Sequence, residues 1–470
     1  MAKKRRARRK PTKKLAAVVK AARAAVQDLP DDSEVWYCLG IVLDRCERST
    51  EAETAFRRAI ELSPEYPEPW NGLGVVLRSR GEHAEAETAL RQALDLNPDL
   101  RVAWLNLAGA LASQEKHAES EPAARRATEL DPKKAEAWQA LGFALDELGE
   151  HQDAETALRQ AVKLKPDYAM AWVNLGAALV AQEEYAKAAT ACRKATKLDP
   201  GNALAWYNLA VSLEARGKMK ESEAALRRAT KADPDYAEPW YNLGVMLTDR
   251  DERGAKAAFR RALEADPNMA DAWVNLGVLL TEQDKSNEAQ EAFRRATEIR
   301  PEGVEAWHCL GLLLAVQGDY EPAEEALREA VKLAPDRGDM WSTLATALHH
   351  AEKWPESEAA YRRTAELVPT DIDAWASLAS TLMRQERYAE AQRALTRAFR
   401  IDRDDPLVLY NRACLFGLTD RPRQALEALR LAIELDPDWA DDARHDEDLA
   451  SLHDDDRFWD IIGQPRSKQR

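Results

Sequence analysis

The chain has 470 residues, of which 45% are hydrophobic and 32% are charged. This balance provides enough apolar side chains for a core and excludes wholesale disorder. No apolar run approaches the roughly 18 to 20 residues that span a bilayer, so the composition predicts no membrane insertion.

Charge is distributed unevenly along the chain. Residues 1–14 contain nine of the 67 Lys and Arg residues and none of the 82 Asp and Glu residues. Because the formal net charge is −15, the rest of the chain carries −24. The sequence therefore predicts a basic, disordered arm at 1–14 attached to an acidic body.

Eleven of the 14 Trp residues recur at a nearly fixed interval, and this period is the main organisational signal. The spacing is 34 residues throughout, except for one interval of 33 between Trp240 and Trp273, and Leu409 takes the next place. The series is Trp36, Trp70, Trp104, Trp138, Trp172, Trp206, Trp240, Trp273, Trp307, Trp341 and Trp375. A period of this length predicts a stack of identical supersecondary units.

With Trp at position 4, the period defines twelve units over residues 33–439. In the unit 67–100 the apolar and small residues at i, i+3, i+4 and i+7 form two runs, as two amphipathic helices require. Pro closes nearly every unit, because it cannot continue the second helix. A Gly or Ala at position 8 is expected to let that helix approach closely beside the large Trp. The 33-residue unit loses its residue between Leu247 and Ala255, at the predicted turn.

The pattern W-x2-L-G-x2-L, followed by A, by F or L, by A and by P, resembles the tetratricopeptide repeat family over residues 33–439. The resemblance implies an all-α fold, a right-handed α-solenoid (superhelix) of twelve 34-residue helix-turn-helix repeats with terminal capping helices. It says little about function, because the same scaffold serves many partners.

Both ends of the repeat array are expected to be capped. Residues 15–32 align with the second helix of a unit and are predicted to form an N-terminal capping helix. The alternative is a docking or dimerisation face, which would make the chain a homo-oligomer. Residues 440–470 are predicted to form a C-terminal capping helix and tail, with Leu449, Leu452, Phe458, Trp459 and Ile462 covering the last helix pair.

No arrangement of residues predicts an enzyme or a cofactor. His83, His117 and His151 recur at position 17, but stacked units place equivalent residues about 10 Å apart, too far to share a metal ion. His349 and His350 are adjacent on one helix and point about 100° apart, so chelation is not expected. The five Cys residues include no C-x-x-C pair and favour reduced thiols in a cytoplasmic protein.

Position 6 is the most informative place for binding. It carries Asn106, Asn174, Asn208, Asn242 and Asn275, and it is expected to face the inside of the superhelix. Because an Asn amide both donates and accepts, such a row can hold the backbone of an extended peptide. It resembles the asparagine ladder in the tetratricopeptide superhelix of O-linked N-acetylglucosamine transferases, whose catalytic domain has no counterpart here. The alternative is that Asn at this position is only family consensus.

Neighbouring concave positions predict the chemistry of the partner. Tyr207, Tyr241, Glu214 and Asp249 suggest a groove that is apolar and acidic, which favours a protein or peptide with apolar and basic residues. The sequence thus predicts a cytoplasmic, non-enzymatic scaffold that binds an extended peptide along its concave groove. The alternatives are nucleic-acid or anionic-surface association through residues 1–14, docking of that arm on the acidic body, and self-assembly.

Overall fold

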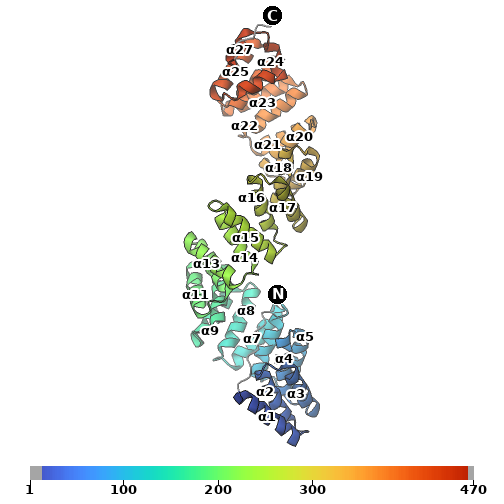
Figure 1. The fold of residues 1–470 in the computed structure, drawn as a ribbon, viewed down its shortest axis with the longest axis vertical. Helices are drawn as coiled ribbons and strands as arrows, with labels where there is room; N and C mark the ends of the chain where they lie inside the picture. Colours follow the sequence, from blue (N-terminus) through green and yellow to red (C-terminus); the bar gives the residue numbers. More distant parts are fainter. Residues whose placement is uncertain (1–12, 464–470) are drawn as a thin grey trace. The chain divides into compact units, whose positions relative to one another are not determined.

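The computed structural model describes residues 13–463, and every element in that range is helical. The predicted basic arm therefore lies outside the described residues, apart from its last two positions. The chain divides into two compact units, one ending at Leu243 and the other beginning at Gly244. Within each unit consecutive helices pack side by side in antiparallel pairs (Figure 1). In each pair we call the first helix A and the second helix B.

The first unit opens with α1 (Lys13–Asp28) and continues with six helix pairs. These are α2 (Ser33–Arg45) and α3 (Ser49–Leu62), α4 (Pro67–Arg80) and α5 (His83–Leu96), α6 (Arg101–Ala112) and α7 (His117–Leu130), α8 (Ala135–Glu147) and α9 (His151–Leu164), α10 (Ala169–Ala181) and α11 (Tyr185–Leu198), and α12 (Ala203–Glu214) and α13 (Met219–Ala232). The boundary between the units falls within α14 (Ala237–Leu247), which is helix A of the seventh repeat.

The second unit contains α15 (Glu252–Ala265), which is helix B of the seventh repeat, and five further pairs. These are α16 (Ala270–Glu282) and α17 (Ser286–Ile299), α18 (Val304–Gln317) and α19 (Tyr320–Leu333), α20 (Gly338–His350) and α21 (Trp354–Leu367), α22 (Ile372–Arg384) and α23 (Tyr388–Ile401), and α24 (Pro406–Leu418) and α25 (Pro422–Leu435). Three short elements follow: α26 (Trp439–His445), the 3-10 helix η1 (Glu447–Leu452) and α27 (Asp456–Ile461). The predicted all-α solenoid of twelve helix pairs is confirmed.

Helices A and B of each repeat meet where their eighth residues face each other. Gly occupies the helix A position in seven repeats, and a Cβ added there would lie within 2.6 Å of the helix B side chain. In α16 and α17 the contact joins Gly277 to the ring of Phe293. The expected reason for a small residue is therefore confirmed: a side chain from helix B lies directly on the backbone of helix A.

In three of the repeats with Ala instead of Gly at this position, a further hydrogen bond joins helices A and B. The fourth residue of helix B is then Ser, and its buried hydroxyl donates to the Ala carbonyl across the pair. Ser222, for example, donates to the Ala210 carbonyl at 2.9 Å. This bond satisfies the hydroxyl and ties helix B to the backbone of helix A.

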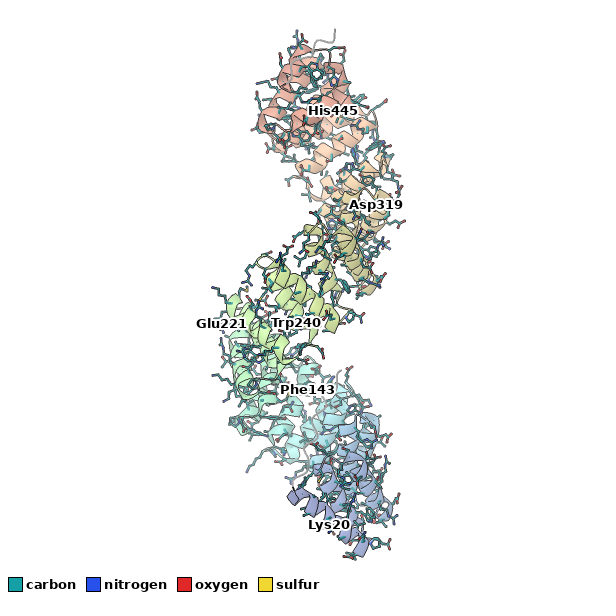
Figure 2. The ribbon with its side chains drawn as sticks, viewed as in Figure 1. Lys20, Phe143, Glu221, Trp240, Asp319 and His445 are labelled. Atoms are coloured by element: carbon teal, nitrogen blue, oxygen red, sulfur yellow. The ribbon has the colours of Figure 1, made fainter. Side chains whose placement is uncertain are left out.

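The eleven Trp side chains link each repeat to the segment before it. Each indole Nε1 donates to the carbonyl of the Pro six residues earlier, at 2.7 to 3.1 Å. Trp240, labelled in Figure 2, donates to Pro234 at 3.1 Å. All eleven are half-buried rather than buried, because one ring edge stays at the surface. They are packing residues, as predicted, and they also join the repeats.

The turn between helices A and B requires a left-handed backbone in eleven of the twelve repeats. Gly takes this place at Gly81, Gly149, Gly217 and Gly318, with φ from 70° to 86°. Acidic residues take it elsewhere, with φ from 54° to 59°: Glu47, Glu115, Glu183, Asp284, Glu352, Glu386 and Asp420. An L-residue in this region costs about 1–2 kcal/mol relative to Gly.

The seventh repeat has no left-handed residue in its turn. The residue that this 33-residue repeat lacks is therefore the left-handed one, in the predicted turn between Leu247 and Ala255. Asp251 instead ends the turn and caps α15, its carboxylate accepting from the Gly254 amide at 3.0 Å. Among the twelve B helices, α15 alone has a side-chain cap.

The described ends pack on their neighbouring repeats. At the N-terminus α1 buries Val19 and Val26 against the first pair, while Val18 is 46% exposed. At the C-terminus η1 and α27 bury Leu449, Leu452, Phe458 and Ile462 completely or nearly so, and Trp459 is half-buried. The cap comprises three short elements rather than one helix, and it begins with Trp439, whose ring stacks on Tyr410 with centroids 4.4 Å apart.

In the last repeat, two departures from the repeat pattern compensate for each other. Leu409 replaces Trp but is only 3% exposed. The Arg412 guanidinium, in place of the position-7 Leu, lies 4.1 Å from the ring centroid of Phe399 and 5.6 Å from that of Phe416. This stack lines the space around Leu409, so the apolar layer continues without the indole.

We expect Glu183→Gly to stabilise the chain by about 0.5–1 kcal/mol, because Gly adopts the left-handed turn without steric cost. Urea unfolding followed by Trp fluorescence measures the change. The reverse exchange, Gly217→Ala, should destabilise the neighbouring repeat by a similar amount. A loss of stability in Glu183→Gly would contradict the assignment of strain to this turn.

We expect Gly277→Ala to lower the free energy of unfolding by about 1–3 kcal/mol, because the new methyl group would overlap the Phe293 ring. The double variant Gly277→Ala/Phe293→Leu should recover part of this loss, since repeat 6 pairs Ala210 with Leu226. Additive losses in a double-mutant cycle would disprove the contact.

Candidate functional site

The predicted peptide-binding residues lie on helix A or directly after it. The first unit holds Asn106 on α6, Asn174 on α10, Tyr207, Asn208 and Glu214 on α12, and Tyr241 and Asn242 on α14. The second unit holds Asp249, just after α14, and Asn275 on α16. They therefore form two sets, and each is described within its own unit.

Position 6 contacts position 5 of the preceding repeat, so several of its side chains join neighbouring A helices. These bonds occupy polar groups at position 6, where the sequence predicted contacts with a bound peptide. The pairs are Asn106 Nδ2 to Asn71 Oδ1 at 2.9 Å, Asn242 Nδ2 to Tyr207 Oη at 3.4 Å, His308 Nε2 with Thr343 Oγ1 at 3.1 Å, and Asn411 Nδ2 to the Ala376 carbonyl at 3.1 Å.

Asn174 and Asn208 form no such bond through their amide nitrogens. Asn208 follows a repeat in which position 5 is the apolar Val173, and its Nδ2 is buried without a hydrogen-bond partner. Asn174 follows Gln139, whose Oε1 already accepts from Tyr168 at 3.1 Å, and its Nδ2 is likewise unpartnered. The two side chains are only 7% and 6% exposed, so they lie beneath the surface of the A helices.

The other predicted residues of the first unit are half-buried. Tyr207 packs edge-on against Tyr236 with ring centroids 5.4 Å apart, and burial raises the pKa of its phenol. Tyr241 and Glu214 are also half-buried. Aromatic faces and one carboxylate therefore border the asparagines. The ligand-binding role of these residues stays a prediction.

In the second unit, a row of exposed aliphatic side chains follows position 9 of three successive A helices. Val245, Val278 and Leu312 are 47%, 37% and 45% exposed, and Val316 at position 13 is 79% exposed. Equivalent residues of stacked helices lie about 8–10 Å apart, so these side chains form one strip. Aligned exposed apolar residues on a folded surface are typical of an interaction site.

Carboxylates stand beside this strip. Asp249 and Glu282, at position 13 of the seventh and eighth repeats, are exposed, and neither forms an ion pair among the described residues. A chain segment lying along the strip would meet apolar contacts and unpaired negative charge. We define Val245, Val278, Leu312, Asp249 and Glu282 as the A-helix strip.

The histidines take part in packing and hydrogen bonding. His151 Nδ1 lies 2.8 Å from Asp146 Oδ1, and the His117 ring packs edge-on against Phe143 with centroids 5.8 Å apart. His349 Nδ1 lies 2.9 Å from the Thr381 hydroxyl, while His350 stacks on Tyr320. Each ring therefore has its own protein neighbours.

One group in the described part of the chain has metal-ligand chemistry: Cys414, Asp446 and Asp448, whose ligand atoms lie within 4.8 Å of one another. Its groups already have structural roles. Asp446 accepts from Tyr410 at 2.8 Å and from the Asp448 amide at 2.9 Å, which starts η1. Burial, reinforced by Asp446 and Asp448, raises the pKa of the Cys414 thiol and so opposes thiolate ligation. This group fastens the C-terminal cap to α24.

The fold and the A-helix surfaces define a helical repeat scaffold, and family comparisons give the same result. Profiles described as tetratricopeptide repeat match residues 14–67, 140–203 and 308–372, and residues 372–405 and 407–438. A profile for the middle tetratricopeptide-like domain of cilia and flagella-associated protein 70 matches residues 65–165 and 208–334. The chain belongs to the tetratricopeptide repeat family, whose fold is generally a non-catalytic scaffold for protein interactions.

The solved structures that match this chain include the following three. The APC/C hetero-tetramer Cut9–Hcn1 is 13% identical over 95% of this chain and 98% of that chain, with a TM-score of 0.43. YrrB, a tetratricopeptide protein with an unusual peptide-binding site, is 26% identical over 42% and 99%, with a TM-score of 0.36. MamA is 24% identical over 34% and 94%, with a TM-score of 0.32. The comparison with curated proteins found no match.

The described helices include none with the length and apolar character needed to cross a membrane. The sequence alone did not single out Leu312 and Val316. Both occupy positions of the repeat, 9 and 13, that are expected to face the concave groove. The available signal was the aliphatic residue at position 9 in three consecutive repeats.

We expect the stability of the tenth repeat to fall on acidification, because the pKa of His349 is about 4. Burial lowers it most, followed by the positive groups of His350 and Arg384. The unfolded chain, with an ordinary His pKa of 6.5, therefore binds more protons between these values, so folding weakens as pH falls from about 6.5 toward 4. At pH 5 the loss is about 1–2 kcal/mol relative to pH 7.5.

His349→Gln, which can keep the bond to Thr381, should remove this component of the pH dependence. Urea unfolding of both proteins at pH 7.5, 6 and 5 measures it. Identical pH slopes in the two proteins would show that His349 titrates normally.

Proposed function

We propose that the chain is a protein-interaction scaffold that holds an extended peptide segment along its A helices. The A-helix strip is the observation that carries this proposal. It combines exposed aliphatic side chains with unpaired carboxylates on successive repeats. The chemistry favours a segment in which apolar residues alternate with Lys or Arg.

The asparagines contribute differently in this proposal. Asn106 and Asn242 donate to the preceding repeat, so they set the spacing of the A helices that carry the groove. Asn174 and Asn208 keep buried, unpartnered amide nitrogens, and a peptide carbonyl would supply the missing acceptor. We therefore place peptide contacts of the first unit at these two residues, beside Tyr207.

We expect a fluorescent eight-residue peptide of alternating Leu and Lys to bind at least tenfold more tightly than matching Leu/Glu or Ser/Lys peptides. Fluorescence anisotropy with the full chain measures the affinities. Val278→Ser/Leu312→Ser should weaken the Leu/Lys peptide about tenfold, because the apolar contacts are removed. Asp249→Asn/Glu282→Gln should weaken it chiefly at low salt.

Leu333→Ser is the matched control for the strip, since Leu333 is 37% exposed, like Val278, but lies on a B helix. Asn174→Ala/Asn208→Ala tests the amide contacts against Asn106→Ala, which loses an inter-repeat bond instead. Equal binding of the Leu/Glu peptide, or equal losses in the strip and control variants, would contradict the proposal.

A further inference from the structure

A recurring glutamate stabilises the outer part of the repeat stack. The fifth residue of helix B is Glu in seven repeats, and each pairs with the Arg one turn later. In four repeats the same carboxylate also binds a cation from the next A–B turn. The seven residues are Glu53, Glu87, Glu121, Glu155, Glu223, Glu324 and Glu358.

Glu87 shows how this site is normally satisfied. Its carboxylate accepts from Gln114 Nε2 and from Lys116 Nζ, both at 2.8 Å, and it pairs with Arg91. The Glu87 side chain is 7% exposed. A nearly buried carboxylate is thus surrounded by donors from two repeats.

In the seventh repeat the charge at this place is reversed, because its fifth helix B residue is Lys256. Lys285 and Gln283 occupy the places of Lys116 and Gln114 in the next turn. Lys256 Nζ and Lys285 Nζ both donate to Gln283 Oε1, at 3.0 and 3.2 Å. The amide has turned its nitrogen toward Glu252 Oε1 at 2.7 Å. Two ammonium groups therefore share one neutral oxygen at a place where seven other repeats provide a carboxylate.

A cavity of about 830 Å³ opens at this cation pair. It is lined by five cationic residues and two carboxylates: Arg253, Lys256, Arg260, Arg261 and Lys285 with Glu252 and Glu264, together with Ala257 and Gln283. Glu264 pairs with Arg261, and Glu252 accepts from Gln283. Arg253, Lys256 and Lys285 form no ion pair among the described residues.

Electrostatics makes this arrangement unfavourable without an anion. Lys256 is half-buried, and burial lowers its ammonium pKa, with Lys285 and Arg260 adding to the effect. The two ammonium groups, which bond to the same oxygen, repel each other, and the carboxylate that seven other repeats place here is missing. An external anion would supply the missing negative charge at this locally cationic place.

We propose that this cavity binds an oxyanion, a carboxylate or phosphoryl group, carried by an acidic segment of a partner protein. The anion replaces the glutamate that Lys256 displaced and receives hydrogen bonds from Lys256 and Lys285, while Arg253 adds charge at the rim. No aromatic residue lines the cavity to stack on a base, which disfavours nucleic acid. The lining comes from α15 and the turn before α17, so the site is separate from the A-helix strip.

The test measures binding of a fluorescein-labelled octaglutamate peptide to the full chain by anisotropy. Lys256→Glu should reduce the affinity at least tenfold, because the new carboxylate pairs with Lys285 as Glu87 pairs with Lys116. Lys256→Gln should give an intermediate loss. Lys197→Glu, an exposed helix B residue in the first unit, makes the same change in net charge and should bind as the unaltered chain does.

Competition then distinguishes the sources of the anion. Displacement of the peptide by inorganic phosphate assigns a phosphoryl-accepting site, while displacement by glutarate alone assigns a carboxylate site, and both support the proposal. Equal affinity of Lys256→Glu and Lys197→Glu would overturn it. Tighter binding of an oligothymidine at the same residues would overturn it in favour of nucleic acid.

Lys256→Glu also tests the structural argument independently of any ligand. Its thermal unfolding midpoint should rise relative to Lys197→Glu, because a repulsive pair becomes an ion pair. Saturating octaglutamate should stabilise the unaltered chain but not Lys256→Glu. A fall in the midpoint of Lys256→Glu would contradict the assigned charge reversal.

Discussion

The contact between the eighth residues of helices A and B determines the geometry of every repeat. A helix B side chain lies on the backbone of helix A, so the two axes approach more closely than paired side chains would allow. In three of the five repeats where Ala replaces Gly, a Ser hydroxyl bonded to the helix A carbonyl also ties the two helices together. The half-buried Trp beside this contact then joins the pair to the preceding repeat. The surfaces that carry binding residues depend on this spacing.

The A-helix side and the B-helix side of the stack consequently have different chemistry. Position 6 contacts the previous repeat, and at Asn106, Asn242 and Asn411 its amide group forms an inter-repeat bond. At position 9 of the seventh, eighth and ninth repeats, the aliphatic residues remain exposed. On the B-helix side, the glutamates of seven repeats pair with cations, whereas Lys256 reverses the charge at this position. At both proposed interaction sites the repeating contacts leave groups without a partner. These are the exposed aliphatic side chains and carboxylates of the A-helix strip, and the ammonium groups of Lys256 and Lys285.

The sequence predicts the paired helices, the tight helix contact and the location of the missing turn residue, because each is encoded within one 34-residue period. It predicts less about contacts between periods. Asn208 and Asn411 both stand at position 6, yet only the Asn411 amide nitrogen bonds to the preceding repeat, and nothing at position 6 itself reveals this. Similarly, Phe399 and Arg412 compensate for Leu409 from different helices, so the departure at each position looks unfavourable alone. The sequence places Lys256 at the position that is Glu in seven other repeats. Only the structure shows that Lys256 and Lys285 both donate to Gln283, with no carboxylate between them.

The indole bond to the preceding Pro carbonyl also determines where the chain tolerates changes in length. The separation between Pro and Trp is six residues at all eleven junctions, including the junction that follows the 33-residue repeat. The turn between helices A and B, in contrast, accepts the loss of a residue when Asp251 caps the next helix. Insertions and deletions are therefore permitted inside a repeat and excluded between repeats. Evolution can remodel the loops of this array one at a time while the register of its binding surfaces is preserved.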